Sequence, residues 1–365
     1  MAAGALSSIV KNVNDSYQYN VIVIHDDISK YNQYLLNCIN DKKNVSLKFI
    51  YFDVHAATAN DINLRGGTLT KHTYTRLFLH KILPGLDRVL YLDGDILVNS
   101  DLVELFKTDL GECSIGACKS TGLDLDNISS LKQKVFNEKS AGGEFGNMYT
   151  YLTDYIGFKD EELTTYFNAG IILFNLKKSA SKLDLAQDML SKKYLWHDQD
   201  ILNKLFKNDT LILDPKYNVY QKDVEEFFIK NSKMPDIIHF AGPNDKPNRI
   251  MTNIGFSDYW FTVSKTRFYY DALEDYIDKK LAKLQKDMAI QINHGRVSLN
   301  EDSTIETIYH NLKHIKKKKR KRRVIRLIIR CLVDSKRYNK LKKKPQIFFE
   351  DSKSKFIKFL GRYYN

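Results

Sequence analysis

The sequence predicts an α/β protein built on a largely parallel sheet. Short apolar runs alternate with helical segments along the first third of the chain, and strand, helix and strand in this order are typical of βαβ units. The segments 89–92 and 167–176 are dominated by apolar residues, as in strands that are covered on both faces. Polar residues adjoin these runs, and a parallel sheet collects such residues at the carboxyl ends of its strands.

The strands and helices are predicted from their hydrophobic periodicity. Strands are expected at 20–24, 47–54, 89–92, 114–119, 167–176 and 236–242. Helices are expected at 1–10, 29–43, 70–83, 102–106, 179–194, 196–207 and 257–287. Ser29 is a suitable N-cap for the second helix, and Pro84-Gly85 ends the third. The polar stretch 120–146 is expected to form an irregular insertion or lid.

Charge and cysteine content indicate a globular body with a basic tail. Residues 313–365 hold 21 Lys and Arg against 3 Asp and Glu, a net charge of +18, whereas the remainder has 36 basic and 41 acidic residues, a net charge of −5. The four cysteines are too sparse for a disulfide framework, which favours a reducing, cytoplasmic compartment. We expect no membrane span, because no apolar run approaches roughly 18 residues. We expect no signal peptide, because the N-terminus has no basic region followed by an apolar core.

Asp93-Gly94-Asp95 directly follows the apolar strand at 89–92. Residues two apart in an extended chain point the same way, so the two carboxylates can aim at one point. Gly94 lets a ligand approach the backbone, and a hard divalent cation that bridges to a phosphate suits such a site. A strand end with a Gly turn and two solvated carboxylates explains these residues equally well.

Further polar residues fall where the same sheet would present them to one cleft: Asn168, Asp198, Gln199, His239 and Lys246. Each has a simpler explanation when it is taken alone. Asn168 could bond a loop backbone, Asp198 could cap a helix, and His239 could be a satisfied core histidine. Lys246 could be a solvated loop lysine. Their coincidence with the carboxylate pair favours a common site.

The motifs L-D-G-D (92–95), F-N-A-G (167–170), H-D-Q-D (197–200) and H-F-A-G-x-x-x-K-P (239–247) occur in this order. This order resembles family 8 of the retaining glycosyltransferases, whose bacterial branch includes lipopolysaccharide galactosyl- and glucosyltransferases. The resemblance implies a nucleotide-diphospho-sugar transferase (GT-A type) fold, with a mixed, mostly parallel sheet flanked by helices and a helical C-terminal extension. It implies a catalytic domain at 1–275, a helical connector at 276–312 and a basic tail at 313–365.

The resemblance also implies a metal and a donor. Asp95 and His239 are expected to ligate Mn²⁺ (or Mg²⁺), with Asp93 reaching the metal or the ribose; a mixed oxygen and nitrogen ligand set suits Mn²⁺. Lys246 and the backbone of Gly242 match the loop that closes on the phosphates of UDP-hexose. The ion would neutralise the leaving diphosphate.

Residues for the sugar are implied in the same way. Thr73-Tyr-Thr-Arg76 matches a helix motif in which Arg76 contacts the donor sugar and the carboxylate pair, and Asn168 matches an asparagine that holds sugar hydroxyls. Asp198 and Gln199 match the catalytic pair beside the anomeric carbon. Covalent catalysis and same-face attack compete for this retaining reaction. Because an amide is a poor nucleophile, we favour same-face attack, with Asp198 orienting hydroxyls and Gln199 stabilising charge.

The implied reaction moves galactose or glucose from UDP-galactose or UDP-glucose to a cell-surface glycan or glycolipid acceptor. One alternative is a non-catalytic protein that binds membrane surfaces. Another is a Mg²⁺-dependent phosphohydrolase with Asp93 as nucleophile. It ranks lower because two strands precede the motif and Leu97 stands where Thr or Val is required.

The start of the chain departs from the family pattern. Met1 falls within the connection that follows the family's first strand, so that strand and its base-binding segment are expected to be absent. A parallel sheet without a central strand exposes its edges. We therefore expect either a truncated chain or weakened UDP binding.

The basic tail, residues 313–365, combines apolar and basic residues. The apolar positions Val324, Ile325, Ile328 and Ile329 form one helical face, and a helix of this composition lies in the plane of an anionic membrane. Binding of nucleic acid would leave the apolar face unexplained, so we expect none. A solvated, disordered tail is the alternative. The protein is predicted to be cytoplasmic and peripheral at the inner face of the plasma membrane.

Overall fold

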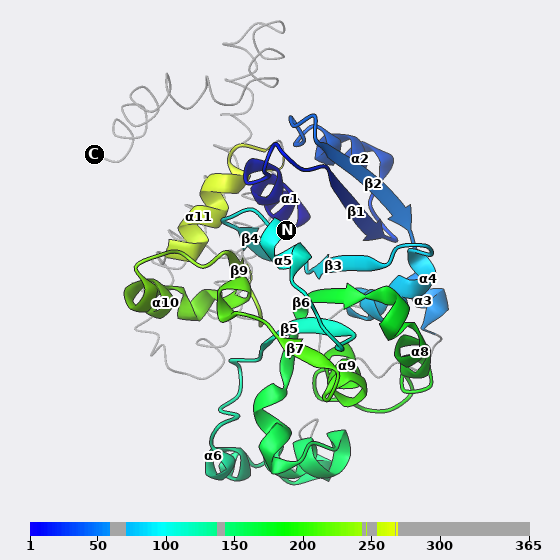
Figure 1. Ribbon diagram of the computed structural model, residues 1–365, viewed down its shortest axis with the longest axis vertical. Helices are drawn as coiled ribbons and strands as arrows, with labels where there is room; N and C mark the ends of the chain where they lie inside the picture. The colour runs from blue at the N-terminus through cyan, green and yellow to red at the C-terminus, as the bar shows by residue number, and fades with distance from the viewer. Residues whose placement is uncertain (59–70, 137–142, 243–245, 247–253, 267, 269–365) are drawn as a thin grey trace, which may run out of the picture. The chain divides into compact units, whose positions relative to one another are not determined.

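The computed structural model describes residues 1–58, 71–136, 143–242, 246, 254–266 and 268. The elements in these ranges belong to one compact unit, Met1–Thr266. Their strands form three sheets, with helices packed around them (Figure 1). The helical connector at 276–312 and the basic tail at 313–365 lie outside the described residues.

The strands are β1 (Tyr19–His25), β2 (Val45–Tyr51), β3 (Arg88–Leu92), β4 (Ile96–Val98), β5 (Ile115–Lys119), β6 (Phe167–Asn175), β7 (Thr210–Ile212), β8 (Val219–Tyr220) and β9 (Ile237–His239). The α-helices are α1 (Ala2–Lys11), α2 (Lys30–Asn37), α3 (Val54–Ala57), α4 (Leu79–Ile82), α5 (Val103–Lys107), α6 (Ile128–Gln133), α7 (Met148–Thr150), α8 (Leu176–Gln187), α9 (Asp198–Phe206), α10 (Val224–Asn231) and α11 (Ile254–Val263). The 3₁₀-helices are η1 (Lys71–Phe78), η2 (Gly143–Phe145), η4 (Asp160–Thr165), η5 (Pro215–Tyr217) and η6 (Gln221–Asp223), and η3 (Tyr151–Ile156) is a π-helix.

The sheets mix parallel and antiparallel strands. β1 is parallel to β2, with α2 as the crossover. In the sheet β3-β6-β5-β7, β6 is antiparallel to both neighbours, whereas β5 and β7 are parallel. In the sheet β4-β9-β8, β9 is antiparallel to β4 and parallel to β8. The predicted α/β class, with mixed sheets flanked by helices, is confirmed.

The pairing of β3 differs from the sequence prediction and positions the site. We expected β3 to continue a parallel sheet with β1 and β2, but it runs antiparallel to β6, with Leu92 opposite Ile171. The backbone N–H of Asp93 donates to the carbonyl of Gly170 at 2.8 Å, which extends this pairing by one residue. The L-D-G-D and F-N-A-G motifs therefore lie side by side.

The helix predicted at 70–83 is divided into η1 and α4, and most of its length is 3₁₀. In a 3₁₀-helix, residues three apart lie on the same side, so Thr73 and Arg76 face the same way. Ser29 caps α2 as predicted by accepting a hydrogen bond from the Asn32 N–H at 3.2 Å, although the helix ends at Asn37. The stretch predicted to be irregular contains α6.

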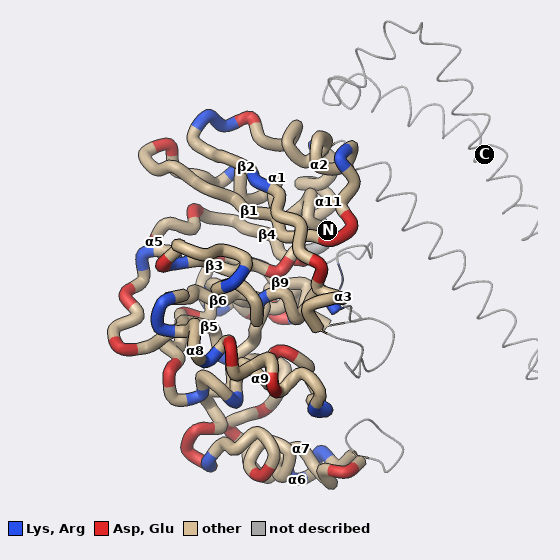
Figure 2. Tube along the Cα trace, turned by 90° about the vertical axis from the view of Figure 1, so that its right-hand side faces the viewer, with Lys and Arg blue, Asp and Glu red and all other residues tan. Residues whose placement is uncertain are grey.

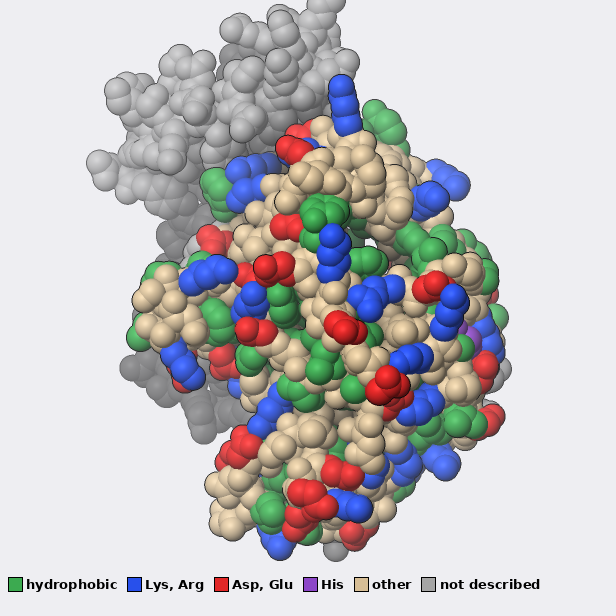
Figure 3. Space-filling model, in the orientation of Figure 1, with side chains coloured by type: hydrophobic (Ala, Val, Ile, Leu, Met, Phe, Trp, Pro, Cys, Tyr) green, Lys and Arg blue, Asp and Glu red, His purple; other side chains and the backbone are tan. Residues whose placement is uncertain are grey.

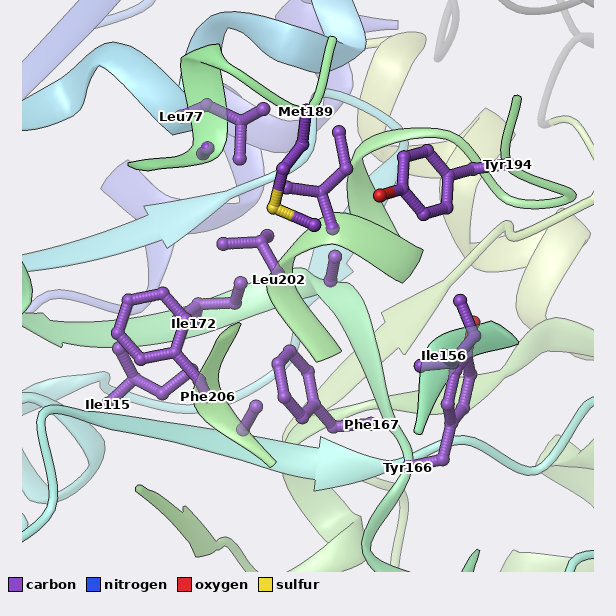
Figure 4. Close-up of a cluster of buried hydrophobic side chains, with 14 of the residues drawn as sticks. Leu77, Ile115, Ile156, Tyr166, Phe167, Ile172, Met189, Tyr194, Leu202 and Phe206 are labelled. Carbon is purple, nitrogen blue, oxygen red and sulfur yellow. The ribbon is translucent and has the colours of Figure 1, made fainter. Parts of the chain in front are cut away.

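The main hydrophobic cluster surrounds β6, whose residues from Phe167 to Phe174 are all buried. Figure 4 shows Phe167 and Ile172 of β6 with Phe206 of α9 and Ile115 of β5. Full burial of such a side chain contributes about 1.5–3 kcal/mol. This packing gives the polar start of β6 a rigid support.

Acidic and basic residues are both distributed along the described part of the chain (Figure 2). On the face shown in Figure 3, apolar, acidic and basic side chains are interspersed. Within the described ranges, no helix combines the length and apolar character that crossing a membrane requires.

Candidate active site

Asp93, Asp95 and His239 come together at the turn between β3 and β4. Ile96 of β4 pairs with His239 of β9, which places the preceding Asp95 beside the imidazole. The Nε2 atom of His239 lies 3.7 Å from Asp93 Oδ2 and 3.6 Å from Asp95 Oδ1. The ligand atoms of all three residues fall within 4.8 Å of one another, close enough to share one ion.

The orientation of His239 is set by its second nitrogen. Nδ1 lies 2.9 Å from Oδ1 of Asn218, which is buried. An amide oxygen only accepts hydrogen bonds, so Nδ1 carries a proton, and Nε2 is the nitrogen that faces the two carboxylates. A metal-binding histidine is commonly oriented by a bond of this kind.

The donor set fits a divalent cation of the Mn²⁺ type, because two carboxylates and one imidazole offer both oxygen and nitrogen ligands. Burial opposes the charged form of Asp95, but His239 and Lys246 outweigh it and hold the pKa of Asp95 well below its ordinary value. Lys246 Nζ contacts Asp95 Oδ2 directly. Asp95 is therefore an ionised carboxylate that is 8% exposed.

Arg76 of η1 joins the carboxylate pair to Asp198. Its guanidinium donates to Asp93 Oδ1 at 2.9 Å, and its Nε lies 3.0 Å from Asp198 Oδ2. The Tyr91 hydroxyl also donates to Asp93 Oδ1, at 2.8 Å, while the Tyr91 ring lies 4.6 Å from the guanidinium carbon. These bonds occupy Oδ1 of Asp93 and leave its Oδ2 directed toward His239.

Asp198 is the first residue of α9 and is buried. Thr73 Oγ1 donates to its Oδ1 at 2.5 Å. Burial raises the pKa of Asp198 to about 6, against the opposing effects of Arg76 and Thr73. The carboxyl group therefore changes charge close to neutral pH.

Gln199 is held at both ends of its amide. Nε2 donates to the Tyr166 hydroxyl at 3.0 Å, and Oε1 accepts from Asn168 Nδ2 at 3.0 Å and from the Ala169 N–H at 3.1 Å. The Tyr166 hydroxyl in turn donates to Asp200 Oδ1 at 2.6 Å. The position of the amide is therefore fixed by β6 and by the buried Asp200.

Asn168 connects the two halves of the site. Its Oδ1 accepts from Asn218 Nδ2 at 2.9 Å and from the Gly170 N–H at 3.0 Å. A continuous series of amide hydrogen bonds thus runs from Gln199 through Asn168 and Asn218 to the imidazole of His239.

Gly242 lies in the turn after β9 with a φ of +87°, in the left-handed region that favours glycine. Lys246 is described, whereas 243–245 and 247–253 are not. The structure therefore brings Asp93, Asp95, His239, Lys246 and Arg76 into one group, and Asp198, Gln199 and Asn168 border it.

Several residues of the site were not assigned from the sequence. A Cβ atom on Gly170 would lie 2.2 Å from His239 Cε1, so only glycine leaves room for the ring. A glycine within an apolar strand indicates such a close approach, so Gly170 could have been recognised from the sequence. Tyr91 and Asn218 carried no comparable signal, because they sit in ordinary β-favouring sequence.

His197, which precedes Asp198, has a φ of 53° and is buried. This conformation is uncommon for a residue with a side chain, and such residues concentrate at functional sites. The strained peptide fixes the point at which α9 begins and so the position of Asp198.

Comparison with known proteins identifies the fold and the family. The structure superposes on the bifunctional glycosyltransferase WbbM in its apo form with a TM-score of 0.61 and 26% identity, covering 75% of this chain and 49% of WbbM. It superposes on the galactosyltransferase LgtC, solved with donor and acceptor sugar analogues, with a TM-score of 0.53 and 25% identity, covering 73% of this chain and 92% of LgtC. The fold is thus that of the GT-A type glycosyltransferases.

The family model for glycosyl transferase family 8 matches residues 1–249, and the chain belongs to this family. A putative glycosyltransferase of Haemophilus influenzae is 28% identical over 252 residues, which are 66% of this chain and 67% of that protein. A lipopolysaccharide 1,2-glucosyltransferase of Escherichia coli is 27% identical over 283 residues, 72% of this chain and 73% of that protein. The chain spans about half the length of WbbM.

Proposed function

We propose that this chain is a metal-dependent, retaining hexosyltransferase. It moves galactose or glucose from UDP-galactose or UDP-glucose to a glycan or glycolipid acceptor at the cell surface. Mn²⁺, or Mg²⁺ in its place, is the proposed metal. Relatives that act in lipopolysaccharide synthesis support this class of acceptor.

The observation that carries the proposal is the position of Arg76. It bonds Asp93 of the metal-binding group on one side and pairs with Asp198 on the other. The diphosphate of a donor bound through Asp95 and His239 would therefore lie next to the residues that we assign to the sugar.

When bound, the divalent ion would neutralise the charge of the leaving diphosphate. Lys246 reaches the same place from the loop after β9 and would hold the phosphates together with the backbone of Gly242. Arg76 and Asn168 would bind sugar hydroxyls, Asp198 would orient them, and Gln199 would stabilise positive charge at the anomeric carbon. Since both ends of the Gln199 amide are bonded within the protein, we favour same-face attack. The acceptor oxygen bonds to the anomeric carbon as the bond to the diphosphate breaks, and the acceptor proton passes to the departing phosphate oxygen.

The basic tail, residues 313–365, would hold the enzyme on an anionic membrane surface through its basic and apolar residues. This would place it in the cytoplasm, at the inner face of the plasma membrane, where a lipid-linked acceptor is within reach. We expect no nucleic-acid partner.

The test is release of UDP from UDP-galactose and from UDP-glucose, measured in parallel with Mn²⁺. We expect one donor to be turned over and Asp95→Asn to abolish the release. Asp126→Asn is the matched control, because Asp126 is an exposed carboxylate that pairs with Lys119. Turnover that survives Asp95→Asn would contradict the proposal.

A further inference from the structure

A second group of potential metal ligands lies outside the site described above. It consists of Asp26 and Asp27 at the end of β1, His55 in α3 and His72 in η1. The ligand atoms of Asp26, Asp27 and His72 all fall within 4.8 Å of one another. The segment after β1 and the helix η1 therefore bring ligand atoms to one point, and His55 of α3 lies beside Asp26.

The distances within this group suit a small divalent ion. Asp26 Oδ1 lies 3.4 Å from His72 Nδ1, and Asp26 Oδ2 lies 3.8 Å from His55 Nε2. Two ligands that are each about 2.1 Å from a tetrahedral ion are separated by about 3.4 Å. The two imidazole rings stand nearly perpendicular, at 89°, with centroids 6.2 Å apart. His72 belongs to the three residues whose ligand atoms lie within 4.8 Å of one another, and His55 approaches them through the other oxygen of Asp26.

The exposure of these residues favours a site that an ion can enter. The Asp26 side chain is 10% exposed, whereas those of His72 and His55 are 43% and 62% exposed. Asp26 and Asp27 also line a hollow of about 480 Å³, together with Gln33 and Tyr51. A carboxylate that is largely buried between two accessible imidazoles is thus open to solvent on one side.

We propose that Asp26, Asp27, His55 and His72 bind a divalent transition-metal ion of the zinc type. Two imidazoles and one or two carboxylates are ligands that this ion accepts. The ion ties the end of β1 to α3 and η1. Since η1 also carries Thr73 and Arg76, this second ion steadies the helix that contributes to the candidate active site.

The experiment counts bound Zn²⁺ in the chelator-treated full chain that carries Asp95→Asn, which disables the first metal site. We expect one Zn²⁺ per chain, and Co²⁺ in its place should give the visible absorption of a site with nitrogen and oxygen ligands. Adding His72→Ala, or His55→Ala with His72→Ala, should abolish this binding. Because the readout is binding and not sugar transfer, it is independent of the proposed function.

His80→Ala is the matched control. His80 also lies beside one carboxylate, 3.0 Å from Asp184, but it does not belong to this group. It should leave the Zn²⁺ count unchanged. Asp26→Asn provides a second disabling change that keeps the side-chain shape. Absence of Zn²⁺ from the Asp95→Asn chain, or binding that survives His72→Ala and Asp26→Asn, would overturn the proposal.

Discussion

Asn218 Oδ1 accepts the hydrogen bond of His239 Nδ1 at 2.9 Å and thereby directs Nε2 toward Asp93 and Asp95. Replacing Asn218 with Leu removes this acceptor and lets the imidazole rotate or change its tautomer. Loss of such a partner commonly weakens metal binding by about 10- to 100-fold. We expect Mn²⁺ affinity, measured by calorimetry, to fall in this range. Asn231→Leu, at an exposed helix position, should have no effect; equal losses in both variants would contradict the assignment.

Gly170→Ala tests the fit between β6 and the imidazole. The added Cβ would lie 2.2 Å from His239 Cε1 and 2.9 Å from both ring nitrogens, so the ring must move. We expect Mn²⁺ binding to be lost. Gly116→Ala is the control in the neighbouring strand β5, where the added Cβ meets Leu110 and Leu213 at 2.9 and 3.1 Å. Gly116→Ala should lower the stability of the fold while the affinity for Mn²⁺ is unchanged. Loss of Mn²⁺ binding in Gly116→Ala but not in Gly170→Ala would refute the role of Gly170.

Thr73→Val tests the ionisation of Asp198. Burial raises the pKa of Asp198 to about 6, and the Thr73 hydrogen bond opposes this rise. Removing that bond should move the acid limb of the pH profile of kcat/KM to higher pH, because the carboxylate then forms only at higher pH. Thr75→Val on the same helix should leave the limb in place. An unshifted limb in Thr73→Val would show that another group controls it.

The same pKa has a consequence for stability. An unfolded Asp titrates near pH 3.9, whereas the folded group titrates at about 6. Between these values the folded state keeps a proton that the unfolded state has released. The contribution of Asp198 to the free energy of unfolding is therefore fully present below about pH 4 and declines as the pH rises to about 6. Asp198→Asn should remove this part of the pH dependence, as urea unfolding at several pH values would reveal.

Arg76→Met tests the buried charge network. Arg76 is 5% exposed and neutralises both Asp93 and Asp198. Removing one partner of a buried ion pair costs about 3–5 kcal/mol, because the remaining charges lose their compensation. We expect a loss of this size in urea unfolding. Arg88→Met removes hydrogen bonds to two backbone carbonyls and should cost about 1–2 kcal/mol. Similar losses in the two variants would argue against the network.

The sequence allowed the main elements of the site to be predicted, because each of them carried a local signal. Asp93-Gly94-Asp95 followed an apolar strand, and Asn168, Asp198 and His239 were assigned to the same cleft. They were expected on one sheet, but Asn168 lies in the sheet β3-β6-β5-β7, His239 in the sheet β4-β9-β8 and Asp198 in α9. The antiparallel pairing of β3 with β6 was not predicted, since strand direction depends on contacts between segments far apart in the chain. The role of Asn218 was not predicted either. Asn218 directly precedes the two-residue strand β8, and its role depends on a hydrogen bond to His239, a residue of another strand.

The pairing of β4 with β9 has a consequence for how the protein folds. Asp95 and His239 become neighbours only when these two strands, which lie far apart in the chain, have joined. Contacts between such distant segments form slowly, because a long loop must close first. We therefore expect Asp95 and His239 to come together late in folding. Binding of Mn²⁺ by the two carboxylates and the imidazole would then show that β9 has paired with β4. A folding intermediate that forms before this pairing would bind Mn²⁺ more weakly.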